Sequence, residues 1–172
     1  SIFLIACEDG PKHLATAGEK WPNVVGEEQV FPEIQNTEPS LDSAIYKMVH
    51  ALAKRDQAYT TQHVMQGTDY RNFFPFLNTG TNKERDAGFI ASLYLAGNQK
   101  HMNRWMGKLS RTGFTKIDKI EYGQVQIHHG YEIHKVEKIW VIMNDGKSHP
   151  IEPFGSVIRT KQGFKVWSFK DT

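Results

Sequence analysis

The sequence is short of the residues that mark several common classes of protein. Its 172 residues include one cysteine, which excludes an intramolecular disulfide and an all-cysteine metal site. No apolar stretch reaches the roughly 18–20 residues that a membrane-spanning helix requires. The formal net charge is only +2, and lysine and arginine form no long run. Nucleic acid is therefore not the expected partner, because attraction to phosphates dominates that kind of affinity.

Sequence motifs for known catalytic chemistry are also missing. The chain has no glycine-rich nucleotide loop, no nucleophile elbow and no pair of carboxylates at a recognisable spacing. Cys7 lies in an apolar tract, an environment that does not activate a thiol. We therefore predict no cofactor and no metal, and favour a non-catalytic protein.

Length and composition favour one domain preceded by a leader. A chain of 172 residues with 39% hydrophobic residues can bury one core, but is short for two full domains. Residues 8–39 are rich in Glu, Gly, Pro and Asn, and Pro22, Pro32 and Pro39 interrupt regular structure. We predict that residues 1–39 form an extended leader that tethers the domain or wraps its surface. Residues 40–172 form a single α+β domain.

The first half of this domain has helical patterns. Ser40 is a natural N-cap, and Asp42 favours the positive end of a helix. The apolar residues that follow share one helical face: Leu41, Ala44, Ile45, Met48, Val49 and Leu52. We expect a short helix over 57–65, a packed loop or single helical turn over 70–76, and two further helices before Gly113. The pair Gly97-Asn98 is read as the end of one helix and the N-cap of the next.

The rest of the chain favours β-strands. From Tyr131 to Phe169, bursts of β-branched and aromatic residues end in turn signals, at Asn144-Asp145-Gly146 and at residues 160–163. In the preceding strand, a change of apolar phase at Gly123 predicts a β-bulge. The continuous apolar run 139–143 predicts a central strand covered on both sides. Pro150 and Pro153 move the next strand to an edge or introduce a bulge.

Helices followed by a curved, mostly antiparallel sheet are an α+β plan. Three stretches, LDSAIYKMVHALAKRD, IWVIMNDGKS and SVIRTKQGFKVWSF, together resemble the nuclear transport factor 2-like superfamily, a cystatin-like cone shared with ketosteroid isomerases and polyketide cyclases. The resemblance covers about residues 40–169. It departs from the family at Trp167, which stands three positions after its usual place. Members include enzymes, binding modules, lipoproteins and subunits of assemblies, so the fold alone fixes no function.

The resemblance implies a pocket lined by inward side chains of the cone. The candidates are Tyr46, Tyr59, Asp69, Tyr70, His101, Trp105, Tyr131 and Trp140. An isomerase-like site would pair a carboxylate base with a donor to an oxyanion, and Asp69 with Tyr70 is the nearest such pair. Packing is the more common role of Tyr and Trp, and we favour it here. For His101 and Trp105, one helical turn apart, we favour a place in the core over a partner-binding face.

Four histidines in the strand region raise the question of a metal or pH-sensing site: His128, His129, His134 and His149. Adjacent residues of a strand point to opposite faces, and Gly130 places the first two at a hairpin turn. No cysteine or carboxylate stands at a ligand spacing. We interpret these residues as exposed turn histidines.

The first seven residues, SIFLIAC, switch abruptly from apolar to acidic. Leu4-Ile5-Ala6-Cys7 resembles a bacterial lipobox, which implies that Cys7 is acylated and that the protein belongs to the cell envelope. The basic start of a signal peptide is missing. The alternative is a buried or anchoring segment of a mature subunit in an organellar, membrane-associated complex.

These patterns favour a non-catalytic binding or accessory module with a protein partner, held by its N-terminal segment to a membrane surface or a larger assembly. A small-molecule isomerase, dehydratase or cyclase with a polar cavity is the second hypothesis. A structural subunit of an organellar complex is the third.

Overall fold

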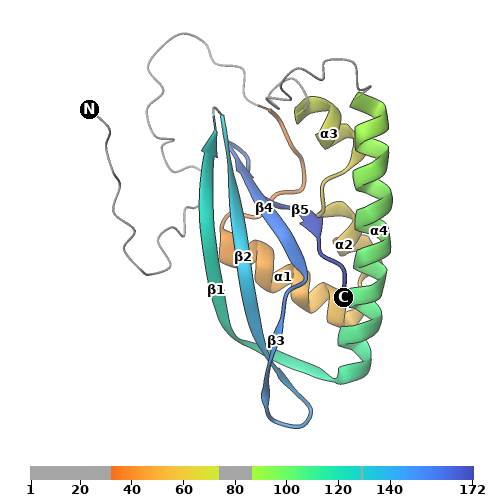
Figure 1. Ribbon diagram of the computed structural model, residues 1–172, viewed down its shortest axis with the longest axis vertical. Helices are drawn as coiled ribbons and strands as arrows, with labels where there is room; N and C mark the ends of the chain where they lie inside the picture. The colour runs from red at the N-terminus through yellow and green to blue at the C-terminus, as the bar shows by residue number, and fades with distance from the viewer. Residues whose placement is uncertain (1–31, 74–86, 129) are drawn as a thin grey trace, which may run out of the picture.

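The computed structural model describes residues 32–73, 87–128 and 130–172, and Figure 1 shows their arrangement. Within these residues the order is α1 (Leu41–Lys54), α2 (Gln57–Gln62), α3 (Gly67–Phe73), α4 (Ala87–Thr112), β1 (Phe114–His128), β2 (Tyr131–Met143), β3 (Ser148–Ile151), β4 (Phe154–Thr160) and β5 (Gly163–Phe169). Helix α1 crosses one face of the sheet, and α4 runs along the long axis of the molecule (Figure 1). The predicted α+β class, with helices packed on a curved antiparallel sheet, is confirmed.

Helix α1 forms as the sequence predicts. The Ser40 hydroxyl oxygen accepts a hydrogen bond from the Ser43 backbone N–H at 3.1 Å, and Arg55 closes the helix in the left-handed conformation. All six residues of the predicted apolar face are buried, together with Ala51. This face packs into the main core against α4 and the sheet.

Helix α4 differs from the prediction. It is one continuous helix of 26 residues, so the expected break at Gly97-Asn98 is wrong. A glycine inside a helix costs only about 1 kcal/mol relative to alanine, and the side chain of Asn98 caps no helix. It is buried and hydrogen-bonded to β5 instead. The segment after α2 forms the short helix α3, close to the single helical turn that was one of the two expectations.

The sheet has the order β1-β2-β4-β5. Strand β3 pairs with residues 139–142 of β2, whereas β4 pairs with residues 132–134 of the same strand. Both predicted turns are present, with positive φ angles of 72° at Gly146 and 137° at Gly163. The register of β1 against β2 shifts between Tyr122 and Val125, as the phase change at Gly123 predicts. Strand β3, which carries Pro150, is a short edge strand.

Strand β2 lies between other strands, but its apolar run is not covered on both faces. Ile139, Val141 and Met143 are buried, whereas Trp140 and Ile142 are partly exposed. The prediction of two buried faces is therefore wrong. The large apolar side chains on the outer face are accommodated by partial exposure, as is usual on protein surfaces.

Strands β4 and β5 are buried on both faces, and this divides the core in two. Val157, Phe164 and Val166 belong to the larger cluster, with α1 and the C-terminal half of α4. Ile158 and Trp167 face a smaller cluster formed with α3 and the start of α4. The alternation of faces along a strand produces this division.

Candidate functional site

The eight aromatic and polar candidates do not converge on one pocket. Tyr46 is 42% exposed on the outer side of α1. Trp140 lies on the outer face of β2, where its Nε1 donates to Glu121 at 2.9 Å and the Lys138 ammonium stands over its ring. Tyr131 belongs to the smaller core and stacks on His128 at 4.5 Å between ring centroids.

The side chains of His101 and Trp105 hold the end of the sheet. The Nδ1 atom of His101 lies 3.1 Å from the Phe169 carbonyl oxygen, and Trp105 Nε1 donates to the Lys170 carbonyl oxygen at 2.9 Å. With Asn98, they recur on α4 at intervals of three and four residues, hence on one face. Side chains on this face of α4 therefore bond the backbone groups at the end of β5 and just after it, as a neighbouring strand would do at the edge of a sheet.

Asp69 belongs to a buried ion pair. Its carboxylate accepts a hydrogen bond from the Lys165 ammonium at 2.6 Å, and both side chains are at most 4% exposed. The backbone N–H groups of Gln66 and Gln35 donate to the same carboxylate at 2.8 and 3.3 Å, and Lys165 also donates to the Gln35 carbonyl oxygen at 2.7 Å. Burial lowers the pKa of Lys165, although the Asp69 charge opposes this shift. These contacts fix α3 and the segment before α1 to β5.

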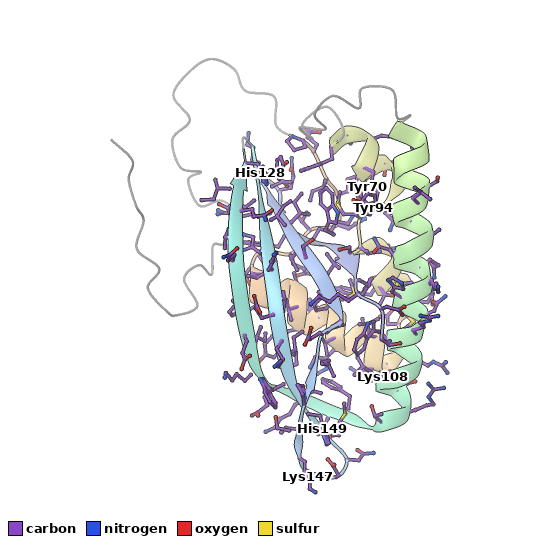
Figure 2. All side chains as sticks on the ribbon, in the orientation of Figure 1. Tyr70, Tyr94, Lys108, His128, Lys147 and His149 are labelled. Atoms are coloured by element: carbon purple, nitrogen blue, oxygen red, sulfur yellow. The ribbon has the colours of Figure 1, made fainter. Side chains whose placement is uncertain are left out.

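Tyr70 is adjacent to Asp69 but bonds to other groups. Its hydroxyl donates to the Trp167 carbonyl oxygen at 3.1 Å and accepts from Asn98 Nδ2 at 3.3 Å. Its ring stacks on Tyr94 at 5.4 Å, and Figure 2 shows the two side by side between α3 and α4. Burial raises the pKa of Tyr70 far above its ordinary value. The phenol therefore stays neutral and acts as a structural hydrogen-bonding group.

A cavity of about 230 Å³ lies between α4 and the α2–α3 connection. Its lining is Thr61, Val64, Met65, Gln66, Leu95, Asn98, Gln99 and Met102. Among these described residues none has a titratable side chain, and none was a predicted pocket residue. We interpreted Asn98 from the sequence as a helix N-cap, and no local sequence pattern marks the other polar residues of the lining as part of a cavity. The cavity offers amides, a hydroxyl and apolar surface to a small neutral molecule.

A cluster of polar side chains that the sequence did not predict surrounds Glu38. Within 4 Å of its carboxylate lie Lys47 (2.7 Å), Ser43 (2.8 Å), Tyr59 (2.8 Å) and His63 (3.7 Å). Burial alone would raise the pKa of Glu38, but the hydrogen bonds outweigh it and hold the pKa below its ordinary value. The backbone of Glu38 also pairs with Phe164 on the edge of β5, at 2.8 Å in both directions. The cluster thus fastens the entry of the chain to α1, α2 and the sheet.

His134 corrects the interpretation of the histidines. It is 1% exposed, and its Nε2 lies 2.8 Å from the Glu132 carboxylate, which also accepts from Arg159 at 3.2 Å. Reading it as an exposed turn histidine is wrong, because the neighbouring charges satisfy it inside the sheet. His128 and His149 do lie exposed or half-exposed near turns (Figure 2), and His129 lies outside the described residues.

The polar groups of these clusters bond to one another and to the backbone. Among the described residues no three His, Cys, Asp or Glu side chains are placed to hold a metal ion. The described helices include none that is long and apolar enough to cross a membrane. Among the described residues, the three buried carboxylates are Glu38, Asp69 and Glu132. Each bonds to a cationic side chain, and none lines the cavity.

Comparison with known proteins gives a likeness in structure and none in sequence. No protein-family model and no curated protein matches the sequence. The structure is similar to a chain from Campylobacter jejuni described as an NTF2-like transpeptidase, with a TM-score of 0.31 and 9% sequence identity, over 73% of this chain and 95% of that chain. Independently of this likeness, the described helices and sheet have the α+β arrangement that a nuclear transport factor 2-like fold implies.

Proposed function

We propose that this protein is a non-catalytic binding or accessory module, held by its N-terminal segment to a membrane or to a larger protein assembly. The observation that carries the proposal is the pairing of the three buried carboxylates with cations: Asp69 with Lys165, Glu132 with Arg159, and Glu38 with Lys47. A general base must come within hydrogen-bond reach of a substrate proton. Each of these carboxylates is occupied by partners within the chain.

The cavity supports the same proposal. Acid–base chemistry on a carbon acid requires a titratable group beside the substrate. The described residues that line the cavity supply two glutamines, an asparagine, a threonine and apolar side chains. This lining suits recognition of a neutral group and provides no proton acceptor for the isomerase hypothesis.

The path of the chain before α1 supports attachment through the N-terminal segment. Ile34 is buried in the smaller core, and Glu38 pairs with Phe164 of β5 through its backbone. A pull on the chain at Ile34 would therefore act on the smaller core and on the edge of β5.

We assign the anchor to Cys7, which lies outside the described residues, on the resemblance of Leu4-Ile5-Ala6-Cys7 to a lipobox. The protein would then face its partners from the bacterial envelope as a lipoprotein. Docking of residues 1–7 on a neighbouring subunit of an organellar complex is the alternative.

A turnover assay tests the non-catalytic proposal. The purified protein is incubated with a β,γ-unsaturated ketone and a β-hydroxyacyl thioester, the substrate types of isomerases and dehydratases, and products are followed by mass spectrometry. We expect no turnover above buffer. Turnover that is abolished by Gln99→Ala, a change at a cavity residue whose side-chain hydrogen bond to Asn103 is exposed, would overturn the proposal.

A further inference from the structure

The outer face of α4 has charge of a single sign. The sequence of this helix contains no Asp or Glu and four basic residues, Lys100, Arg104, Lys108 and Arg111, all exposed. Their spacings of four, four and three residues place them in one row along the helix. In a protein whose net charge is only +2, this row concentrates positive charge on one surface.

Neighbouring groups position three of these cations. Arg104 is paired with Asp171, and the Lys108 ammonium lies 4.6 Å from the centroid of the Trp105 ring. Arg111 folds back over Gly107, where an added Cβ would stand 3.7 Å from its guanidinium. Together with Thr172, the three basic side chains line a surface hollow of about 360 Å³. The lining side chains are therefore three cations and one threonine hydroxyl, and the neighbouring Asp171 carboxylate is paired with Arg104.

Stabilisation of the helix does not account for the row. Basic residues near a helix C-terminus interact favourably with its dipole, but the effect falls off within the last turn. The last turn of α4 contains Arg111 alone. Lys100 and Arg104 lie about three and two turns earlier, where the dipole contributes little.

An apolar end extends the same row. Leu93 is 58% exposed and lies seven residues, or two turns, before Lys100, while Tyr94 beside it is 44% exposed. From Leu93 to Arg111 the row is roughly 27 Å long at 1.5 Å per residue. It therefore presents an apolar contact at one end and cations along the remainder.

We propose that this face of α4 is the docking surface for an acidic, linear segment of a partner protein, such as a helix with carboxylates at three- and four-residue intervals. The proposal deepens the proposed binding function and rests on it. We infer an acidic partner from charge complementarity, because a row of cations one helix wide matches a single row of carboxylates on a partner segment. A flat anionic membrane would favour cations spread across a plane, with apolar groups among them and not at one end.

The test measures binding of a defined probe to the full chain. The probe is a fluorescein-labelled helical peptide of Glu, Ala and Leu with Glu at every fourth position. The control peptide has Gln in place of Glu. By fluorescence anisotropy we expect the Glu peptide to bind and the Gln peptide not to bind, with affinity falling as salt rises.

Matched variants locate the site. Lys108→Glu with Arg111→Glu should weaken binding by about tenfold or more, because attractive contacts become repulsive. Lys135→Glu with Lys161→Glu makes the same change of net charge at two exposed lysines of the sheet, one on β2 and one at the β4–β5 turn. We expect this variant to bind within about twofold of the parent. Equal thermal unfolding of the variants excludes loss of the fold.

Two results would overturn the inference. One is equal loss of binding in both charge-reversed variants, which would indicate a general effect of net charge. The other is tighter α4-dependent binding to phosphatidylglycerol vesicles or to single-stranded RNA than to the Glu peptide. Failure here leaves the cation-paired carboxylates intact, so the non-catalytic proposal would stand. Turnover at the cavity would overturn that proposal without changing the peptide result.

Discussion

Removing the charge of Lys165 should be among the most damaging single changes to the described fold. Lys165→Met leaves the Asp69 carboxylate buried with two backbone N–H donors, from Gln66 and Gln35, but with no counter-charge. Breaking one side of a buried ion pair costs about 3–5 kcal/mol, because a charge is left without compensation in a region of low dielectric. The change also removes the donor to the Gln35 carbonyl oxygen.

The double variant Asp69→Asn with Lys165→Met should be more stable than Lys165→Met alone. Asparagine keeps an acceptor oxygen for the Gln66 N–H, and no net charge remains buried. Replacing a buried ion pair with neutral groups is often close to neutral in stability. The coupling between the two changes is the quantity to measure.

The assay is urea unfolding at neutral pH with matched m-values. The control is Lys47→Met, the same substitution at a lysine that also pairs with a buried carboxylate, but whose side chain is 56% exposed. We expect that control to cost about 0–1 kcal/mol. The reasoning is refuted if Lys165→Met costs no more than the control, or if the double variant is less stable than Lys165→Met.

Three further predictions concern stability. Asn98→Ala should cost about 1–3 kcal/mol in urea unfolding, because it leaves the Phe169 N–H buried without its acceptor. Gly163→Ala should lower the melting temperature clearly more than Gly146→Ala. Both glycines have positive φ, but only at Gly163 would a Cβ stand 2.5 Å from a backbone oxygen; equal effects would argue against that contact. Burial alone would raise the pKa of Glu38 and Glu132, but hydrogen bonds and cationic neighbours outweigh it and lower both below 4.5. The stabilisation that each carboxylate contributes should be present above pH 4.5, its ordinary pKa, and lost as the pH falls from there through the lower pKa of the folded protein. Replacing either by Gln should therefore flatten the acid limb of a plot of urea midpoint against pH.

The elements that could be predicted are those whose signals are local. The N-cap and apolar face of α1 lie within one stretch of sequence, and the turns at Gly146 and Gly163 require positive φ. The phase change at Gly123 is likewise local to β1. The break predicted at Asn98 failed because its partners, in β5, are 69 and 71 residues away.

The candidate site could be predicted less well, for the same reason. Asp69 was noticed, but nothing near it in the sequence indicates that Lys165 neutralises it from 96 residues away. His134 looked like a turn histidine until the sheet brought Arg159 beside Glu132. Side-chain chemistry of this kind depends on strand register, which apolar patterning constrains only coarsely.

The proposal of an anchored binding module is tested most directly by the intact mass of the protein from its native host, with the N-terminus mapped. The account predicts a chain that begins at Cys7 and carries the added mass of a diacylglyceryl group and an amide-linked acyl chain. An unmodified chain that retains residues before Cys7 would contradict the lipid anchor and favour docking of residues 1–7 on a larger assembly.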